Sequence, residues 1–231
     1  ARGWWWTANK TKADLIEFYK DRSARIIDLE AYFVNGQRRY ACTTVSNTGA
    51  NKKDWWWFDG VSWAEMHEMV AKYRARITDL DVQVIDGQRV FSGVMVKNQG
   101  GDAKKWTAFS NITLNEVREA MSKYRMRLAD LERLSDSRFA GVLEERGGQN
   151  WWWFTNQSWE STKLLVGQFG ARVIDIERRV VDGQARFDVI LLDNNNELEW
   201  RIGQMLRNGS DGTRGFILRE VNGPTLGAIL P

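Results

Sequence analysis

The stretch RITDLDVQVIDGQRVFSGVMV, residues 76–96, decides the fold, because related versions of it recur along the chain. It contains two runs rich in β-branched residues, joined by Asp86-Gly87, a dipeptide that supplies the positive φ angles of a tight hairpin turn. Each version opens with the pattern Arg-apolar-x-Asp-apolar-acid: RIIDLE, RITDLD, RLADLE and RVIDIE. The opening arginines are Arg25, Arg76, Arg127 and Arg172, with spacings of 51, 51 and 45 residues. This regularity indicates a tandem repeat.

A tryptophan-rich segment precedes every hairpin at the same distance. Its first positions are Trp4, Trp55, Trp106, Trp151 and Trp200, with steps of 51, 51, 45 and 49 residues. The chain has 13 tryptophans among 231 residues, and most belong to these segments, three of which read Trp-Trp-Trp. Bulky aromatic residues favour a β-strand, so each segment is predicted to add a third strand to the hairpin.

Between the tryptophan segment and the hairpin, each copy has a hydroxyl residue followed by apolar residues at helical spacing. These residues are predicted helix N-caps: Thr11, Ser62, Thr113 and Ser158. Asp14, Glu65 and Glu116, three residues further on, would complete capping boxes. The sequence thus predicts an α+β fold of four helix-plus-three-strand units, an antiparallel meander with one helix per unit, in a curved, half-barrel or ring-like array. We expect one domain over 1–231, with units 4–54, 55–105, 106–150 and 151–199 and a C-terminal cap over 200–231.

Composition restricts the classes of function. The chain has 33 basic and 30 acidic residues, so a net charge of +3 gives no reason to expect a nucleic-acid partner. No apolar run approaches the roughly 20 residues of a membrane-spanning helix, and we expect no membrane insertion. The only histidine, His67, lies in one unit alone, so a Ser-His-Asp site repeated in every unit is excluded. Cys42 is the only cysteine and is predicted to be a buried apolar side chain. We expect no catalytic residue, no cofactor and no metal.

The tryptophans are the candidate ligand-binding residues. Side chains alternate along a strand, so the middle tryptophan of each triplet faces away from its two neighbours. The middle position is Thr or Arg in two copies, which favours exposure and makes the middle tryptophans candidate stacking platforms for sugar rings or extended peptide. Two further candidates lie just inside helix caps. The full set is Trp5, Trp56, Trp152, Trp63 and Trp159. The alternative is core packing, with each indole burying on the order of 200 Å².

Two acidic columns lie on the first strand of the hairpins, two residues apart and on one face. They are Asp28, Asp79, Asp130 and Asp175, and Glu30, Asp81, Glu132 and Glu177. Paired carboxylates can bind calcium or perform acid-base catalysis. However, the second hairpin strand carries Arg38, Arg39, Arg89, Arg138 and Arg186. Opposite charges across a ladder are common, so we expect cross-strand ion pairs.

Repeats that combine WWWF, a helix, R-[IV]-x-D-[LI]-E and a DGQ hairpin resemble tandem repeats of bacterial proteins and the N-terminal domain of fungal polyglycine hydrolases. The resemblance covers almost the whole chain. It implies a secreted protein with an open, barrel-like arrangement of repeats. In that family the repeats are joined to a domain of serine β-lactamase type, whose Ser-x-x-Lys motif does not occur here.

We therefore expect a non-catalytic recognition module, secreted or extracytoplasmic and already without any signal peptide, that binds glycan or extended peptide through its repeated aromatic positions. The alternative is a structural scaffold, or an inhibitor or protein-interaction domain without a small-molecule site. Exposed sheet edges would also allow a homodimer. An enzyme ranks third, and an asymmetric cleft with acidic residues of strongly shifted pKa would favour it.

Overall fold

The structure is a computed structural model that describes residues 3–135, 137–195, 200–204, 215–219 and 228–229, the last three ranges by their backbone alone. The four predicted units are present, each with one helix and a three-stranded antiparallel sheet. The first unit has β1 (Trp4–Lys10), α1 (Lys12–Asp21), β2 (Ala24–Val34) and β3 (Gln37–Ser46); the second has β4 (Trp55–Val61), α2 (Trp63–Tyr73), β5 (Ala75–Ile85) and β6 (Gln88–Lys97). The third has β7 (Trp106–Ile112), α3 (Leu114–Tyr124), β8 (Met126–Arg133) and β9 (Phe139–Glu145); the fourth has β10 (Trp151–Gln157), α4 (Trp159–Phe169), β11 (Ala171–Val181) and β12 (Gln184–Asp193).

Strand order within each unit differs from the predicted meander. The order is β1-β3-β2 in the first unit, and the other three units repeat it. The helix carries the chain from the first strand across the sheet to its far edge, which leaves the central position for the last strand of the unit. The hairpin then fills that gap, and its second strand pairs on both sides.

The local signals form the predicted structures. Thr11, Ser62 and Thr113 accept the N3 backbone N–H, and the N3 carboxylates of Asp14, Glu65 and Glu116 complete three capping boxes. Ser158 caps α4 by accepting the backbone N–H of Ser161. Both residues of the three glycine-containing hairpin turns have positive φ: Asn35-Gly36, Asp86-Gly87 and Asp182-Gly183. Each turn therefore has the geometry that matches the twist of its two strands.

A β-bulge in the first hairpin strand of each unit determines which side chains meet. In β2 the pairing register shifts between Ile26 and Asp28, so one residue lies outside the ladder. A bulge reverses the alternation of side chains beyond it. As a result, Ile26 and Leu29 both point into the hydrophobic core, at 0% and 1% exposure, whereas Arg25 and Asp28 both line internal cavities. The same shift occurs in β5, β8 and β11.

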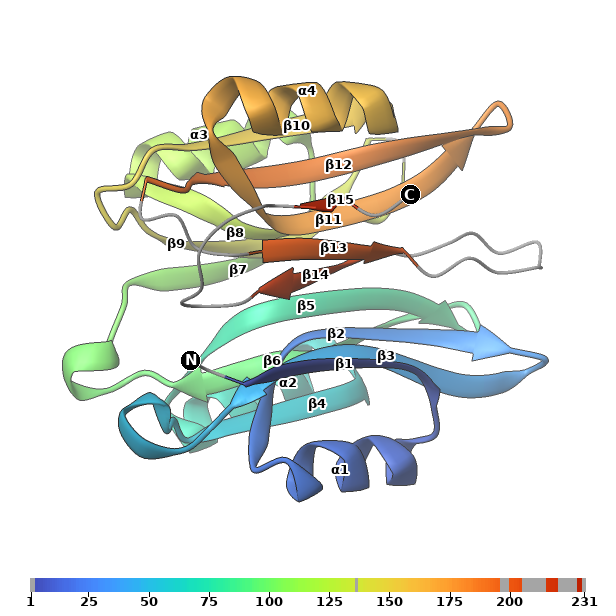
Figure 1. Cartoon of the computed structure of the whole chain (residues 1–231), viewed down its shortest axis with the longest axis vertical. Helices are drawn as coiled ribbons and strands as arrows, with labels where there is room; N and C mark the ends of the chain where they lie inside the picture. The colour runs from blue at the N-terminus through green and yellow to red at the C-terminus, as the bar shows by residue number, and fades with distance from the viewer. Residues whose placement is uncertain (1–2, 136, 196–199, 205–214, 220–227, 230–231) are drawn as a thin grey trace.

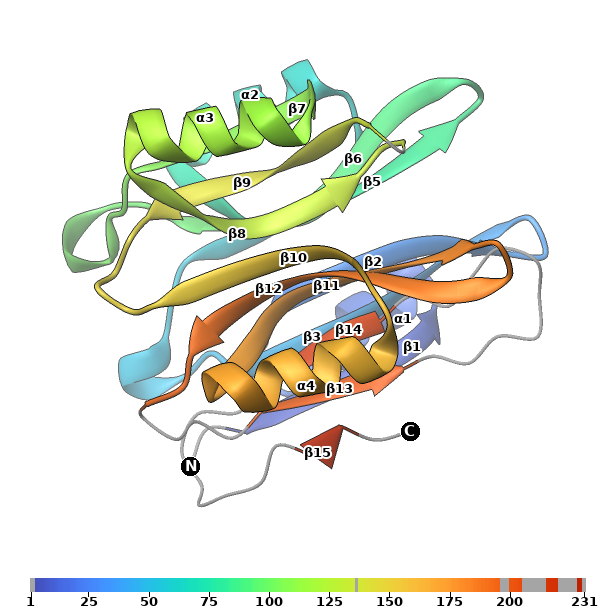
Figure 2. The ribbon, with the colours of Figure 1, turned by 90° about the horizontal axis from the view of Figure 1, so that it is seen from above.

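The units are arranged with their helices outside and their sheets inside (Figures 1 and 2). The bulged strands β2, β5, β8 and β11 contact one another in sequence, and residues from all four line one internal cavity. Strand pairing in the described residues stays within three-stranded sheets, so these strands form no closed barrel.

The first and third positions of the tryptophan segments, which we call the first and third tryptophan columns, form the contacts between units. Trp55 and Trp57 pack on the hydrophobic core of the first unit, Trp106 on that of the second, and Trp151 and Trp153 on that of the third. Each sheet thus turns one face to its own helix and the other to the preceding unit. The apolar character of both columns follows from this burial.

A fifth sheet follows the fourth unit and lies between it and the first (Figure 1). It consists of β13 (Trp200–Gln204), β14 (Gly215–Arg219) and β15 (Ala228–Ile229), in the order β14-β13-β15. The rest of the predicted cap, and the side chains of Trp200, Arg201 and Ile202, lie outside the described residues. Within the described part of the chain, every helix is too short or too polar to cross a membrane.

Candidate functional site

The middle tryptophans lie on the face of each sheet that its own helix covers. The rings of Trp56 and Tyr73 are stacked, with centroids 4.5 Å apart and an interplanar angle of 23°, and Trp152 stacks on Phe169 with the same values. Trp5 lies close over Gly3, where an added Cβ would be 2.7 Å from the ring. All three middle tryptophans remain partly exposed. They therefore pack against their own units and still reach solvent.

The two tryptophans inside helix caps have similar surroundings. The ring of Trp63 lies 5.0 Å from that of Phe91 and 4.8 Å from that of His67, and Trp159 lies 5.3 Å from Phe187. Both are partly exposed. The five candidate tryptophans are distributed over three units, so the structure does not bring them together in one pocket.

The acidic columns converge at the centre of the molecule. Three aspartates of the first acidic column accept backbone N–H groups there, which the sequence did not reveal. Asp79 accepts the backbone N–H of Leu29 at 3.0 Å, and Asp130 accepts that of Leu80 at 2.9 Å. Asp175 accepts the N–H of Leu131 at 2.9 Å. Each carboxylate thus joins its strand to the strand of the preceding unit. The expected cross-strand pairing with hairpin arginines is wrong for these three residues, because the bulge turns them toward the neighbouring unit.

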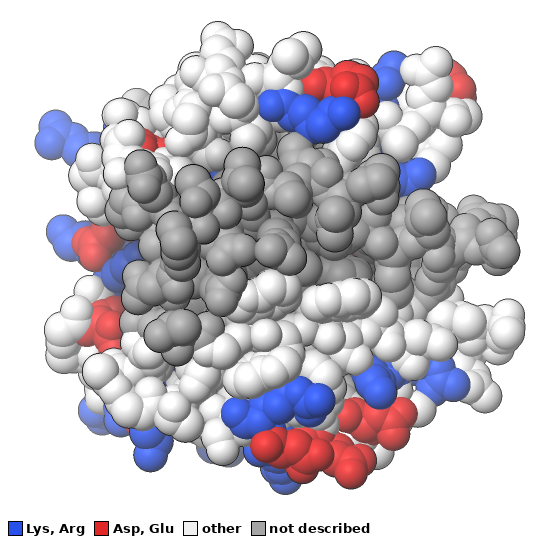
Figure 3. Space-filling view, in the orientation of Figure 1, with Lys and Arg blue, Asp and Glu red and all other residues white. Residues whose placement is uncertain are grey.

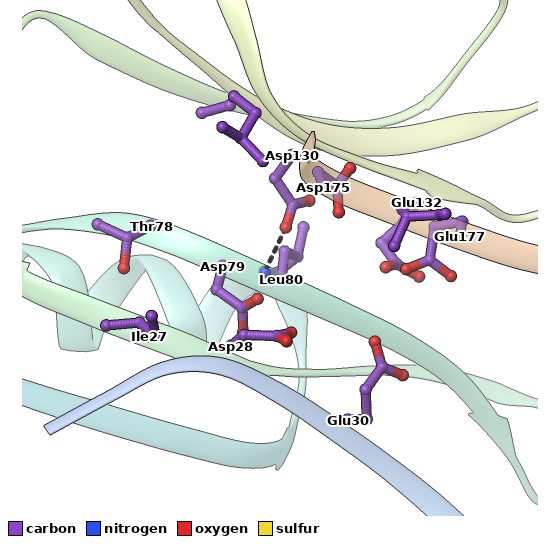
Figure 4. Close-up of a pocket in the computed structure, with 13 residues that line it drawn as sticks. Ile27, Asp28, Glu30, Thr78, Asp79, Leu80, Asp130, Glu132, Asp175 and Glu177 are labelled. Atoms are coloured by element: carbon purple, nitrogen blue, oxygen red, sulfur yellow. Dashed lines mark hydrogen bonds between the residues drawn. The ribbon is translucent and has the colours of Figure 1, made fainter. Parts of the chain in front are cut away.

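Carboxyl groups of both acidic columns line a small cavity with a volume of about 30 Å³ (Figure 4). Asp130 lies beside Asp175, and Glu132 lies beside Glu177. Burial, and after it the neighbouring carboxylate, raises the pKa of Asp130 and of Glu132 well above the ordinary range. Burial also raises the pKa of Asp175 to about 7, against the opposing hydrogen bond from Leu131.

The size of this cavity limits its chemistry. A space of about 30 Å³ corresponds to one or two water molecules, which is too small for an organic substrate. The raised pKa values follow from burial of like charges, which can occur without any catalytic role. Among the described residues, no group of three or more His, Cys, Asp or Glu side chains is placed to hold a metal ion.

A second, larger pocket lies beside the arginines that open the repeated hairpin pattern, which we call the arginine column (Arg25, Arg76, Arg127 and Arg172). Its volume is about 400 Å³, and the arginines Arg25, Arg76 and Arg127 line it together with Lys53 and Lys104. Elsewhere, on the face in Figure 3, acidic and basic side chains lie close together along the margins. The sequence identified the arginine column as part of the repeat but assigned it no role. The signal for the pocket was the bulge, which apolar residues at both 26 and 29 could have revealed.

Comparison with known proteins gives no further assignment. No protein-family model matches the chain, and a search of curated proteins finds no match either. The resemblance to the repeat domain of polyglycine hydrolases stays a prediction.

Proposed function

We propose that this chain is a non-catalytic recognition module that binds glycan or extended peptide through the partly exposed tryptophans at its strand starts and helix caps. One observation carries the proposal: all five candidate tryptophans keep contact with solvent, whereas full burial would have favoured a purely structural role. Stacking one face of Trp56 on Tyr73 fixes the orientation of the indole, and a fixed aromatic ring loses little entropy when a ligand binds.

The experiment is a glycan and peptide panel read by quenching of tryptophan fluorescence with acrylamide. A ligand that protects the quenchable indoles would support the proposal. Changes of Trp5, Trp56 and Trp152 to leucine keep an apolar side chain and remove the flat ring, so each is expected to weaken binding by about tenfold, or about 1.4 kcal/mol. Trp57→Leu and Trp153→Leu are matched controls, because these residues contact the preceding unit. Equal losses in both sets would refute a role for the middle column.

The second candidate is a scaffold or protein-interaction domain. It is favoured by the first and third tryptophan columns, which form the contacts between successive units. Trp6 belongs to the third column of the first unit and is 49% exposed. If no glycan or peptide protects the indoles, this candidate takes precedence, and its test is the capture of a folded protein that buries Trp6.

A further inference from the structure

The arginine column places one cationic side chain from each unit at the same strand position. The arginines of the first three units, Arg25, Arg76 and Arg127, line the pocket of about 400 Å³. Five cationic side chains line that pocket, against the two carboxylates of Asp28 and Glu144: Arg25, Lys53, Arg76, Lys104 and Arg127. Two of these cations are paired within the protein, Lys53 with Asp102 at 2.6 Å and Lys104 with Glu144 at 3.2 Å. Cations still outnumber carboxylates around the pocket, which has the size of a small-molecule site.

Two arginines of the column have partners within the protein. Arg127 pairs with Glu144, the residue directly opposite it on β9, and also donates to the carbonyl of Leu128 at 2.9 Å. Arg172 donates to the carbonyl of Asp193 at 2.8 Å. In both units the buried guanidinium is thus hydrogen-bonded, as buried charges usually are.

Arg76 differs from both in how many of its donors are hydrogen-bonded. It is only 7% exposed, and its Nε and Nη1 atoms are buried without a hydrogen-bond partner among the described residues. The residue opposite Arg76 is Val96, and apolar residues also lie opposite Arg25 and Arg172, whereas Arg127 faces Glu144. Burial also lowers the pKa of Arg76, which reports a desolvated charge. Two of its donors therefore lack an acceptor, and an anion in the pocket that accepts from Nε and Nη1 would remove the penalty of burying them unsatisfied.

The two lysines are held in place by their loops. Lys104 donates its backbone N–H to Asn98 Oδ1 at 2.8 Å, and Asn98 Nδ2 donates back to the Lys104 carbonyl at 2.9 Å. Asn47 and Lys53 form the same reciprocal pair in the preceding loop, at 3.0 and 2.8 Å. This arrangement fixes the backbone of both lysines before any ligand arrives, which lowers the entropic cost of binding.

We propose that this pocket binds a small organic oxyanion, a molecule whose carboxylate or phosphate group is held by the guanidinium of Arg76. A guanidinium holds both groups well because its parallel N–H bonds match two oxygens of the anion. Arg25 also lines the pocket, and Lys53 and Lys104 lie there in ion pairs with Asp102 and Glu144. Apolar side chains such as Val45, Val96 and Leu192 contact the body of the ligand. This site shares no residue with the aromatic positions, so it goes beyond the function proposed above.

The experiment measures binding of inorganic phosphate, citrate and a hexose phosphate by calorimetry and by the shift in melting temperature. At a free ligand concentration about 100 times Kd, we expect the melting temperature to rise by about 5 to 10 °C. Arg76→Met should weaken binding by at least about tenfold while folding normally, since an apolar side chain removes two buried donors that lack an acceptor. Arg89→Met is the matched control, because Arg89 is exposed near the hairpin turn of the same unit.

A second variant tests the same point without removing a cation. Val96→Glu places a carboxylate opposite Arg76, as Glu144 lies opposite Arg127, and should abolish anion binding by occupying the guanidinium internally. The proposal is overturned if none of the three anions binds the wild-type protein, or if Arg76→Met and Val96→Glu bind them as tightly as the wild type does. Retained binding in Arg89→Met together with loss in both pocket variants would establish the site.

Discussion

The acidic cavity predicts that this protein becomes less stable as pH rises from 5 to 8. Burial raises the pKa of Asp175 from 3.8 to about 7, so the folded state binds a proton in this range that the unfolded state has released. For a raised pKa, the stabilisation is complete below the unfolded value and is lost as pH rises through the folded value. Each pH unit between the two values corresponds to about 1.4 kcal/mol, so the loss from this one carboxyl between pH 5 and pH 8 is about 3 kcal/mol.

Asp175→Asn isolates this contribution. The asparagine Oδ1 can still accept the N–H of Leu131, so the link between the two units is kept while the charge is removed. Relative to the wild type, the variant should gain about 3 kcal/mol of stability between pH 5 and pH 8. Asp130 and Glu132 have pKa values raised for the same reason, so part of the pH dependence will remain in the variant.

The assay is urea denaturation followed by tryptophan fluorescence at several pH values between 5 and 8. Asp86→Asn is the matched control, because Asp86 is exposed at a hairpin turn and the equivalent residue of the first unit is already Asn35. The reasoning is refuted if the free energy of unfolding of the wild type stays constant or increases over this range. It is also refuted if Asp175→Asn shows the same pH dependence as the wild type.

Three further predictions test other parts of the fold. Asp81→Ala leaves the buried N–H of Ala31, now 3.1 Å from Asp81 Oδ2, without its acceptor, and should cost about 1 to 3 kcal/mol in urea denaturation, whereas Asp81→Asn should cost less. Gly93→Ala would place a Cβ 2.3 Å from a backbone carbonyl oxygen and should lower the melting temperature, whereas Gly101→Ala, with open space around it, should not. Burial, and after it two nearby carboxylates, raises the pKa of Cys42, so a thiol reagent should react only after unfolding; rapid reaction in the native protein would contradict this.

Features determined by local sequence were predictable. The helix starts at Ser62 and Thr113 follow from the side-chain oxygen that satisfies the first free N–H groups, and the hairpin at Asp86-Gly87 follows from its positive φ angles. The repeat made each of these predictions stronger, because the N-cap residue occurs in four units and the glycine turn in three. The α+β fold with four units could therefore be predicted from the sequence.

The interior could not be predicted in the same way. Regular alternation would have placed Arg25 and Asp28 on opposite faces of a strand. Because of the bulge between Ile26 and Asp28, both side chains line the same pocket. The hydrogen bond from Leu29 to Asp79 spans two units, and the hydrophobic pattern of one unit contains no information about how a neighbouring unit is placed. The difference between Val96 and Glu144 is visible in the sequence, but it gains meaning only once each residue is known to lie opposite an arginine.

The free-energy cost of burying charged groups in the interior favours a ligand-binding role over a purely structural one. Replacing buried charges with well-packed apolar side chains is often neutral or stabilising, so a chain that needed only a stable array would not require them. Here the centre of the molecule holds carboxyl groups with raised pKa values, and Nε and Nη1 of Arg76 are buried without a hydrogen-bond partner among the described residues. The third unit shows that the same strand position accommodates a carboxylate opposite its arginine, since Arg127 pairs with Glu144. The fold thus permits a carboxylate opposite Arg76 and has Val96 there instead, which is the arrangement expected where an anion from solution completes the site.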